Sequence, residues 1–352
     1  MSPKSDAPKA ILYSYPPSIW ASAGKPNERE KGFGKDEITI KTVDLLMGEN
    51  FDPAYLRINP NGTVPTLVVP LEKTLSAPDV EVRYKALTET KTIIEFLDRS
   101  RTVISKTKTT SNAPAPALAP VSVGLSHLNN EIIALLHSPT ADPGFLRLAS
   151  ATLPFSSPSE LAAASSPEVI LTKALLANKV QALKTHLHGL ISPNPSDSPV
   201  PISPSSQKTV DFLKQKQASI SPTHDIFHNF PDAPTTWDAS EAAAAVAASQ
   251  KFFQTTRAAW ATHLPSILDE LNSKIIGPLA LGDQISLADL HLMAWLARAV
   301  SASGGSNDKE GNDAISKGEE AKEWKVGEKL VQYWETILER KSFQVVYKDG
   351  LH

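Results

Sequence analysis

Two histidine pairs have a spacing that can present imidazole nitrogens side by side. They lie in "HLH" (186–188) and "HDIFH" (224–228), and neutral imidazole is the commonest metal ligand among side chains. Without carboxylate or thiolate ligands at a matching spacing, such pairs are more often ordinary polar residues than zinc ligands. We therefore interpret both pairs as ordinary polar residues and predict no metal site.

A second stretch joins turn residues to a Val-Pro bond and a strand. In "NPNGTVPTLV" (59–68), four turn formers lead into β-branched and apolar residues. Proline cannot donate to a β-ladder, so Pro65 either opens an edge strand or follows a cis Val64-Pro65 bond in a functional turn. Taken alone, the decapeptide favours the ordinary edge strand.

The first hundred residues alternate strand and helix patterns. Short apolar or alternating runs predict strands, and "FDPAYLRI" (51–58) predicts a short helix capped by Asp52 with Pro53 at its first position. This order predicts a small mixed sheet flanked by helices. The predicted strands are 10–15, 37–45, "TVPTLVV" (63–69) and 81–87, and the last helix is 88–100.

Helical periodicity dominates after a polar, proline-rich linker that follows Arg101. The last long pattern contains Pro265, which predicts a break or kink there. Ser286 and Asp289 have the spacing of a capping box, with Asp in place of Glu, at the start of a largely apolar helix. The predicted helices are 123–137, 166–190, 209–220, 240–275 and 286–300, with a Pro/Ser-rich insertion at 191–207.

Composition excludes several classes of function. The formal net charge is −3 and basic residues are scattered, so we expect no nucleic-acid partner. No cysteine is present, which excludes disulfides, thiolate zinc sites and cysteine catalysis. The N-terminus does not read as a secretory signal and no segment has the apolar length of a membrane span, so we expect a cytoplasmic protein without a membrane partner.

Four motifs in order give the chain a resemblance to the soluble glutathione transferase superfamily. They are "YPPS" (15–18), "NPNGTVPTL" (59–67), "LTETKTIIEFL" (87–97) and "GDQISLADLHLMAWL" (282–296). The resemblance implies a thioredoxin-like α/β glutathione domain over residues 8–102 and an all-helical domain over 120–352. Within the superfamily, the middle of the chain and "YWETILERKSFQVV" (333–346) look similar to the lignin etherase-like and ganglioside-induced differentiation-associated branches.

The resemblance also assigns roles at a glutathione site. It implies a cis Val64-Pro65 bond whose Val backbone pairs with the cysteinyl part of glutathione like an added strand. Glu89 would pair with the γ-glutamyl ammonium, while the Thr90 hydroxyl and the first helical N–H groups would take the carboxylate. A plain helix N-terminus carrying acidic and capping residues is the alternative for this pair.

Activation of the thiol requires a donor that stabilises the thiolate. In the superfamily this donor lies just past the first strand, which points to Ser18, then to Ser22, and last to Tyr15. Ser18 as a simple helix cap is the alternative. The following stretch has Gly24, Pro26 and few apolar residues, so we expect a short, atypical first helix or a remodelled thiol site.

The resulting prediction is a glutathione transferase that uses glutathione as co-substrate and joins its thiolate to a small electrophile. The resemblance also implies a possible homodimer. A non-catalytic transferase-like module for protein partnering, still able to bind glutathione, is the rival prediction.

Overall fold

The computed structural model describes residues 9–34, 37–71, 83–102, 114–191, 204–228, 239–316 and 324–352. Contacts within the chain divide it into two compact units. Unit 1 consists of Met1–Thr42, Thr63–Arg147 and Ala261–His352, and unit 2 consists of Val43–Gly62 and Leu148–Trp260. Each unit is therefore assembled from segments that are distant in the sequence.

Unit 1 contains a four-stranded mixed sheet with the order β2-β1-β3-β4. Strand β1 (Ala10–Ser14) pairs in parallel with β2 (Ile38–Thr42) and antiparallel with β3 (Thr66–Pro70). Strand β4 (Tyr84–Leu87) lies antiparallel to β3. The β-α-β-α-β-β-α order and the mixed sheet confirm the predicted thioredoxin-like architecture of the N-terminal part. Residues 81 and 82 of the predicted fourth strand lie outside the described residues.

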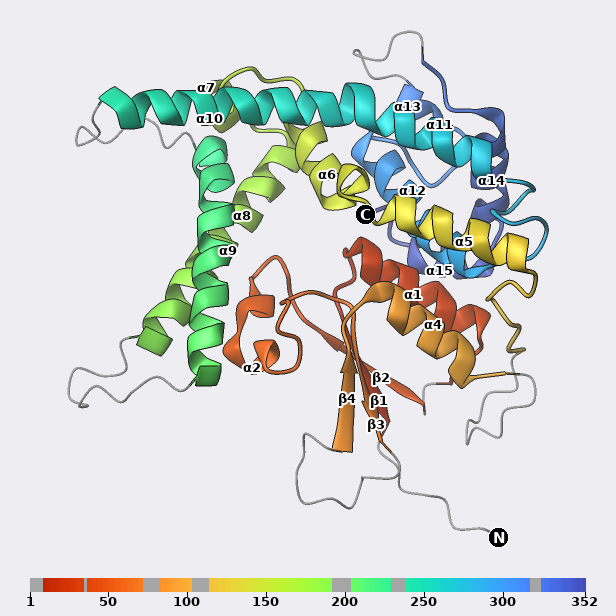
Figure 1. Cartoon of the computed structure of the whole chain (residues 1–352). Coiled ribbons are helices and arrows are strands. Elements are labelled where there is room, and N and C mark those ends of the chain that lie inside the picture. The colour runs from red at the N-terminus through yellow and green to blue at the C-terminus, as the bar shows by residue number, and fades with distance from the viewer. Residues whose placement is uncertain are drawn as a thin grey trace. The chain divides into compact units, whose positions relative to one another are not determined.

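Helices α1 (Ile19–Glu30) and α4 (Thr90–Ser100) lie side by side in unit 1 (Figure 1). Helix α4 buries Ile93, Ile94 and Leu97, two of which join the core formed with the sheet, because this spacing places them on one helical face. Helix α1 runs for 12 residues through Gly24 and Pro26. Its buried residues include small side chains rather than a large apolar stripe, which is why the sequence pattern looked atypical.

The helical remainder of unit 1 is organised around α12 (Leu287–Ala302), which is buried from Leu287 to Val300. Helix α12 packs against α1 and α5. The other helices assigned to this unit are α5 (Val123–Leu136), η3 (Pro139–Ala141), α11 (Leu264–Lys274), α13 (Asp313–Ser316), α14 (Glu328–Leu338) and α15 (Lys341–Val346). The boundary between the two units falls within α6 (Pro143–Thr152) and within the π-helical turn η4 (Ala259–His263), so each of these elements is divided between the units.

Unit 2 is helical and has two apolar clusters. Helix α9 extends well beyond the predicted 209–220 and accommodates Pro222 inside it. Phe227, near its end, is completely buried in one of the clusters, and this burial favours continuing the helix past the proline. The elements of unit 2 are η1 (Glu49–Phe51), α2 (Pro53–Leu56), α7 (Pro158–Ala163), α8 (Pro167–Ile191), α9 (Pro204–His228) and α10 (Ala239–Ala258). Residues 192–203 of the predicted insertion, like residues 103–113 of the predicted linker, lie outside the described residues.

Two local predictions about proline and turn residues are confirmed. Asp52 caps α2 by accepting a hydrogen bond of 2.7 Å from the Ala54 amide, with Pro53 in the first turn. The break near Pro265 takes the form of the π-helical turn η4, after which α11 begins at Leu264. Proline is tolerated there because the first turn of a helix needs no intrahelical amide donor.

Gly62 ends the turn that precedes Val64. Its φ of 60° is left-handed, and a Cβ at this position would lie 3.0 Å from the Asn50 carbonyl oxygen. The Asn50 side-chain amide donates to the Gly62 carbonyl at 2.8 Å, so the turn is tied down. Glycine is required here because L-residues rarely adopt this conformation and no room is left for a side chain.

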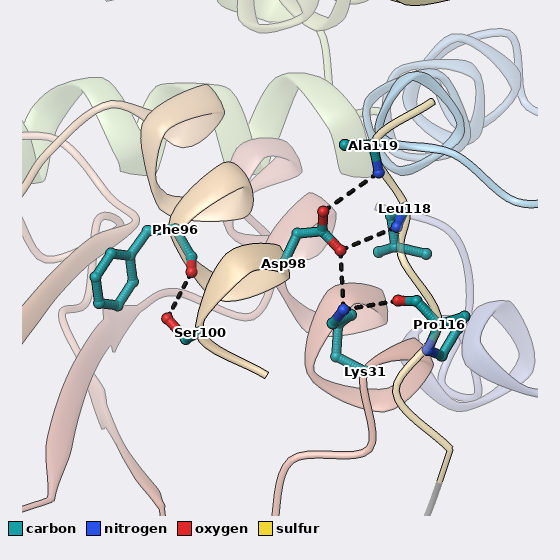
Figure 2. A network of polar contacts seen from close by, with 7 residues as sticks. All are labelled: Lys31, Phe96, Asp98, Ser100, Pro116, Leu118 and Ala119. Carbon is teal, nitrogen blue, oxygen red and sulfur yellow. Dashed lines mark hydrogen bonds and ion pairs between the residues drawn. The ribbon is translucent and has the colours of Figure 1, made fainter. Parts of the chain in front are cut away.

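A buried ion pair joins the C-terminal ends of α1 and α4 in unit 1 (Figure 2). Lys31 Nζ lies 3.0 Å from an Asp98 carboxylate oxygen, and the Lys31 side chain is fully buried. The ammonium also donates to the Pro116 carbonyl at 2.6 Å. Asp98 in turn accepts from the amides of Leu118 and Ala119 at 2.9 and 3.2 Å. The pair therefore anchors the segment that leads into α5.

A second ionic contact connects the end of α1 to the start of α15. Arg340 donates two hydrogen bonds to Glu30, of 2.8 and 3.2 Å. The Ser342 hydroxyl donates a third, of 2.6 Å. Two parallel bonds between a guanidinium and a carboxylate are among the stronger polar contacts in proteins. Residues about three hundred positions apart are thus held together within unit 1.

The predicted capping box at the start of α12 is confirmed. Asp289 accepts from the Ser286 amide at 2.7 Å and from the Ser286 hydroxyl at 2.6 Å. It also accepts from the Ala280 amide at 2.8 Å, which fixes the preceding loop. Burial raises the pKa of the completely buried Asp289 carboxyl, while the three hydrogen bonds act in the opposite direction.

Replacing Asp289 by alanine should lower the free energy of unfolding by about 2–3 kcal/mol, because buried donors lose their acceptor. Chemical denaturation monitored by circular dichroism measures the change. The control is Asp52→Ala at the cap of α2, which is exposed and should cost about 1 kcal/mol or less. Unchanged stability in Asp289→Ala would contradict the structural role of the carboxylate.

Within the described ranges, no helix is both long enough and apolar enough to cross a bilayer.

Candidate functional site

The predicted site residues come from three places in the sequence that meet at one end of the sheet. The antiparallel β3–β4 pairing ends at Leu67↔Leu87, so Val64 and Pro65, which precede β3, and Glu89 and Thr90, which follow β4, lie at the same end of the sheet. Continuing the β1–β3 register past Tyr13↔Thr66 brings the end of β1 to the same place. Because β1 leads directly to Ser18, all the first-choice residues lie around this end of the sheet in unit 1.

The Val64-Pro65 peptide bond is cis, which confirms that prediction. Both residues are buried, and β3 begins at the next residue, Thr66. The Thr66 hydroxyl donates to the Thr63 carbonyl at 3.1 Å and closes the turn. Among the residues that the structure describes, Val64 has no backbone hydrogen-bond partner. Its amide and carbonyl are therefore free to pair with an extended ligand.

Glu89 and Thr90 form the N-terminal boundary of α4. Glu89 has an extended backbone, its carbonyl accepts from the Ile93 amide at 2.9 Å, and its side chain makes no capping bond. The Glu89 side chain is exposed, whereas Thr90 is buried. The first amides of a helix have no intrahelical acceptor and carry the positive end of the dipole. A carboxylate can be held there beside the exposed Glu89.

Ser18 occupies the N-cap position of α1. Its carbonyl accepts from the Ser22 amide at 2.8 Å, and its hydroxyl oxygen lies 3.4 Å from the Ala21 amide. The residue is partly exposed. The same hydroxyl can cap the helix and donate to a thiolate, because its hydrogen remains available while its oxygen accepts from the helix.

Ser22 is placed differently from Ser18. It is completely buried, and its hydroxyl oxygen lies 2.7 Å from His352 Nε2. The hydroxyl also lies 3.4 Å from the Pro16 carbonyl and interacts with Tyr347. Burial, together with the charges of Arg298 and its neighbours, lowers the pKa of His352 to about 4. At neutral pH a neutral imidazole therefore engages the Ser22 hydroxyl.

A three-ring cluster beside α1 was not predicted from the sequence. Trp20 stacks on His137 with ring centroids 3.9 Å apart, and His137 Nε2 lies 2.9 Å from His291 Nδ1. His291 is fully buried, and its Nε2 has no partner among the described residues. Burial is the main cause that lowers the pKa of both imidazoles, to about 4 for His137. Only a lone histidine in an apolar helix, "LADLHLMAWL", hinted at this cluster.

The histidine pairs singled out from their spacing are in unit 2. His224 and His228 stack with ring centroids 4.2 Å apart, and His228 Nδ1 is bonded to the His224 carbonyl at 2.9 Å. Within the described part of the chain, no group of three or more metal-ligating side chains is arranged to hold an ion.

Comparison with known proteins gives the context for this geometry. Residues 34–100 match the family model described as glutathione S-transferase, N-terminal domain. This match contains the cis Val64-Pro65 bond and the Glu89/Thr90 helix start. A search of curated proteins found no match to the chain.

Several solved structures are similar to the chain at low sequence identity. The β-etherase LigF from Sphingobium sp. strain SYK-6 is 15% identical, with a TM-score of 0.53 over 97% of this chain and 100% of that one. Human glutathione S-transferase T1-1 is 17% identical, with a TM-score of 0.43 over 97% of this chain and 88% of that one. A glutathione-bound transferase homolog from Sulfitobacter is 15% identical, with a TM-score of 0.42 over 97% and 98%.

Proposed function

Because residues 34–100 match the N-terminal domain of glutathione S-transferases, we propose that the chain belongs to this superfamily, binds glutathione and activates the thiol for attack on a small electrophile. The observation that carries the proposal is the convergence of Ser18, Val64 and Glu89 at one end of the sheet. These positions offer the three kinds of group that glutathione needs. They are a hydroxyl donor, an unpaired strand backbone and an acidic helix start.

Each part of glutathione has a counterpart in this arrangement. The unpaired Val64 backbone pairs with the cysteinyl residue in the manner of an added strand. Glu89 binds the γ-glutamyl ammonium, and the amides at the start of α4, with Thr90, bind the adjacent carboxylate. Glutathione is a co-substrate in this scheme, and no metal is required.

Thiol activation is assigned to Ser18 in preference to Ser22. The Ser18 hydroxyl is accessible at the positive end of α1, where a thiolate is stabilised by a hydrogen bond and by the helix dipole. The Ser22 hydroxyl is buried against His352, so it would reach a ligand only after that contact opened. The glutathione sulfur, bound next to the Ser18 hydroxyl, is therefore the nucleophile in the proposed reaction.

We extend the proposal to the setting of the protein. It acts in the cytoplasm and forms a homodimer, and its glutathione domain comprises residues 8–102 while its helical domain comprises residues 120–352. Sedimentation of the purified protein, and light microscopy of a tagged chain, test the assembly and the location.

The alternative function is a non-catalytic module that partners other proteins. It is favoured by the use of both serine hydroxyls in contacts within the chain, Ser18 as a cap and Ser22 with His352. Calorimetry with glutathione and an ultraviolet titration of the bound thiolate distinguish the two functions. A bound thiol with a pKa well below its solution value, together with conjugation of a chromogenic electrophile, supports the enzyme. Binding without a lowered thiol pKa or turnover supports the module.

Replacing Glu89 by alanine should weaken glutathione binding about tenfold, because a charge-assisted contact to the ammonium is lost. The loss should be similar across the pH range in which the ammonium stays charged. Glu95→Ala is the matched control, since Glu95 lies on the same helix, is partly exposed, and among the described residues forms ion pairs with Lys91 and Arg99 alone. Equal affinities in the two variants would show that Glu89 does not hold the ligand.

A further inference from the structure

Arg298 is a buried cation without an anionic partner in the described structure. It lies on α12, is only 5% exposed, and has no ion pair with any described residue. One guanidinium nitrogen donates to the Pro17 carbonyl at 3.0 Å, while Nε is buried and has no partner among the described residues. Buried charges in proteins are normally paired, so an unpaired one suggests a functional use.

The charges around Arg298 do not neutralise it. Arg147, from α6, acts on Arg298 as a like charge, and burial with this repulsion lowers the pKa of Arg298 to about 10. The guanidinium therefore remains protonated at neutral pH. Arg298, Lys25 and Arg147 together disfavour the protonated form of His352. Tyr347, also facing Arg298, is kept neutral because burial raises its pKa.

The contact with Pro17 places this charge next to the first turn of α1. The Pro17 carbonyl belongs to the peptide unit that continues into Ser18, so the bonded guanidinium nitrogen lies within about 6 Å of the Ser18 Cα. His137 and His291 contact Trp20 in this turn, and Lys91 acts on both imidazoles. The two imidazoles are neutral at neutral pH, and Lys91 pairs with Glu95 at 4.0 Å.

We propose that Arg298 is a positioning residue whose uncompensated charge, held against the Pro17 carbonyl, stabilises the thiolate at the start of α1. This inference rests on the proposed function and adds to it the positive charge of Arg298 on α12. The guanidinium fixes the loop that carries Ser18 and strengthens the positive potential there. A positive charge in a partly desolvated site favours the ionised form of a neighbouring thiol.

Three variants separate the charge from the hydrogen bond. Arg298→Lys keeps the charge, Arg298→Gln keeps a donor for the Pro17 carbonyl without the charge, and Arg298→Met removes both. In Arg298→Gln and Arg298→Met, the pKa of bound glutathione's thiol should rise by about 1 unit. The value of kcat/KM at neutral pH should then fall about tenfold. Arg298→Lys should restore most of both quantities.

Binding of glutathione at a pH where the thiol stays protonated is the internal control. It should change less than about twofold in every Arg298 variant, because the thiolate is not involved. Arg101→Gln is the matched control for burial, since Arg101 is equally buried but paired with Glu37 at 2.9 Å. It should leave the thiol pKa unchanged. If Arg298→Gln fails to fold, Arg298→Met, which fills the site with an apolar side chain, should still raise the thiol pKa by about 1 unit.

The outcomes are distinguishable. If the wild-type protein lowers the thiol pKa and Arg298→Gln does so equally, the role of Arg298 is refuted while the proposed function stands. If Arg298→Lys and Arg298→Gln raise the thiol pKa to the same extent, the charge is not the cause and the inference is also refuted. If the wild-type protein leaves the thiol at its solution pKa, the proposed function fails and the inference fails with it.

Discussion

Replacing Lys31 by methionine is expected to lower the free energy of unfolding by about 3–5 kcal/mol. The substitution leaves the Asp98 carboxylate buried without its cation and the Pro116 carbonyl without its donor. Methionine fills a similar volume, so the loss is mainly electrostatic rather than a cavity effect. Denaturant unfolding followed by circular dichroism measures the change.

Lys91→Met is the control for this experiment. Lys91 forms an exposed pair with Glu95 at 4.0 Å, which should contribute less than about 1 kcal/mol. Adding Asp98→Leu to Lys31→Met should recover part of the lost stability, because no buried charge remains unpaired. Recovery should be incomplete, since the amides of Leu118 and Ala119 lose their acceptor. A Lys31→Met protein as stable as Lys91→Met would rule out the anchoring role of the pair.

Replacing Ser18 by alanine is expected to reduce kcat for conjugation about 100-fold, the usual effect of removing one donor from a developing or existing anion. Affinity for glutathione measured with the thiol protonated should remain nearly unchanged, because Ser18 contacts only the sulfur. Loss of the cap should cost about 1 kcal/mol of stability. Rates are therefore compared at a temperature where both proteins are fully folded.

Ser22→Ala provides the comparison for Ser18→Ala. It removes the hydroxyl bonded to His352 and should lower stability by about 1–2 kcal/mol without raising the thiol pKa. A rise in the thiol pKa confined to Ser22→Ala would transfer the activating role to Ser22. An unaltered rate in both variants would leave Tyr15 as the remaining candidate for a hydroxyl donor.

Much of the fold could be predicted because its determinants are local. The strand and helix order of the first hundred residues, the Asp52 cap and the Ser286–Asp289 capping box all depend on residues a few positions apart. Helix α9 was harder to predict. Its extension through Pro222 depends on the burial of Phe227 against other helices, which no local pattern encodes.

The same distinction between local determinants and long-range contacts applies to the candidate site. Val64 and Glu89 could be assigned because each belongs to a recognisable local motif, and their proximity follows from strand register. Contacts between distant residues could not be predicted, such as Ser22 with His352 and His137 with His291. The burial of Lys31 could not be predicted for a different reason. Charged residues usually face solvent, so a polar stretch does not reveal which lysine is buried.

The composition of unit 1 has a consequence for how the chain folds during synthesis. Helix α1 packs against the neighbouring α4 and also against α12 and α15 from the last part of the chain, with polar contacts from Glu30 to Arg340 and from Ser22 to His352. The amide of Leu287 likewise bonds to the Leu118 carbonyl at 3.1 Å. Such long separations in sequence make closure of the unit entropically expensive and slow. During synthesis, residues 10–100 therefore lack these contacts until residues 261–352 of the same unit have been added.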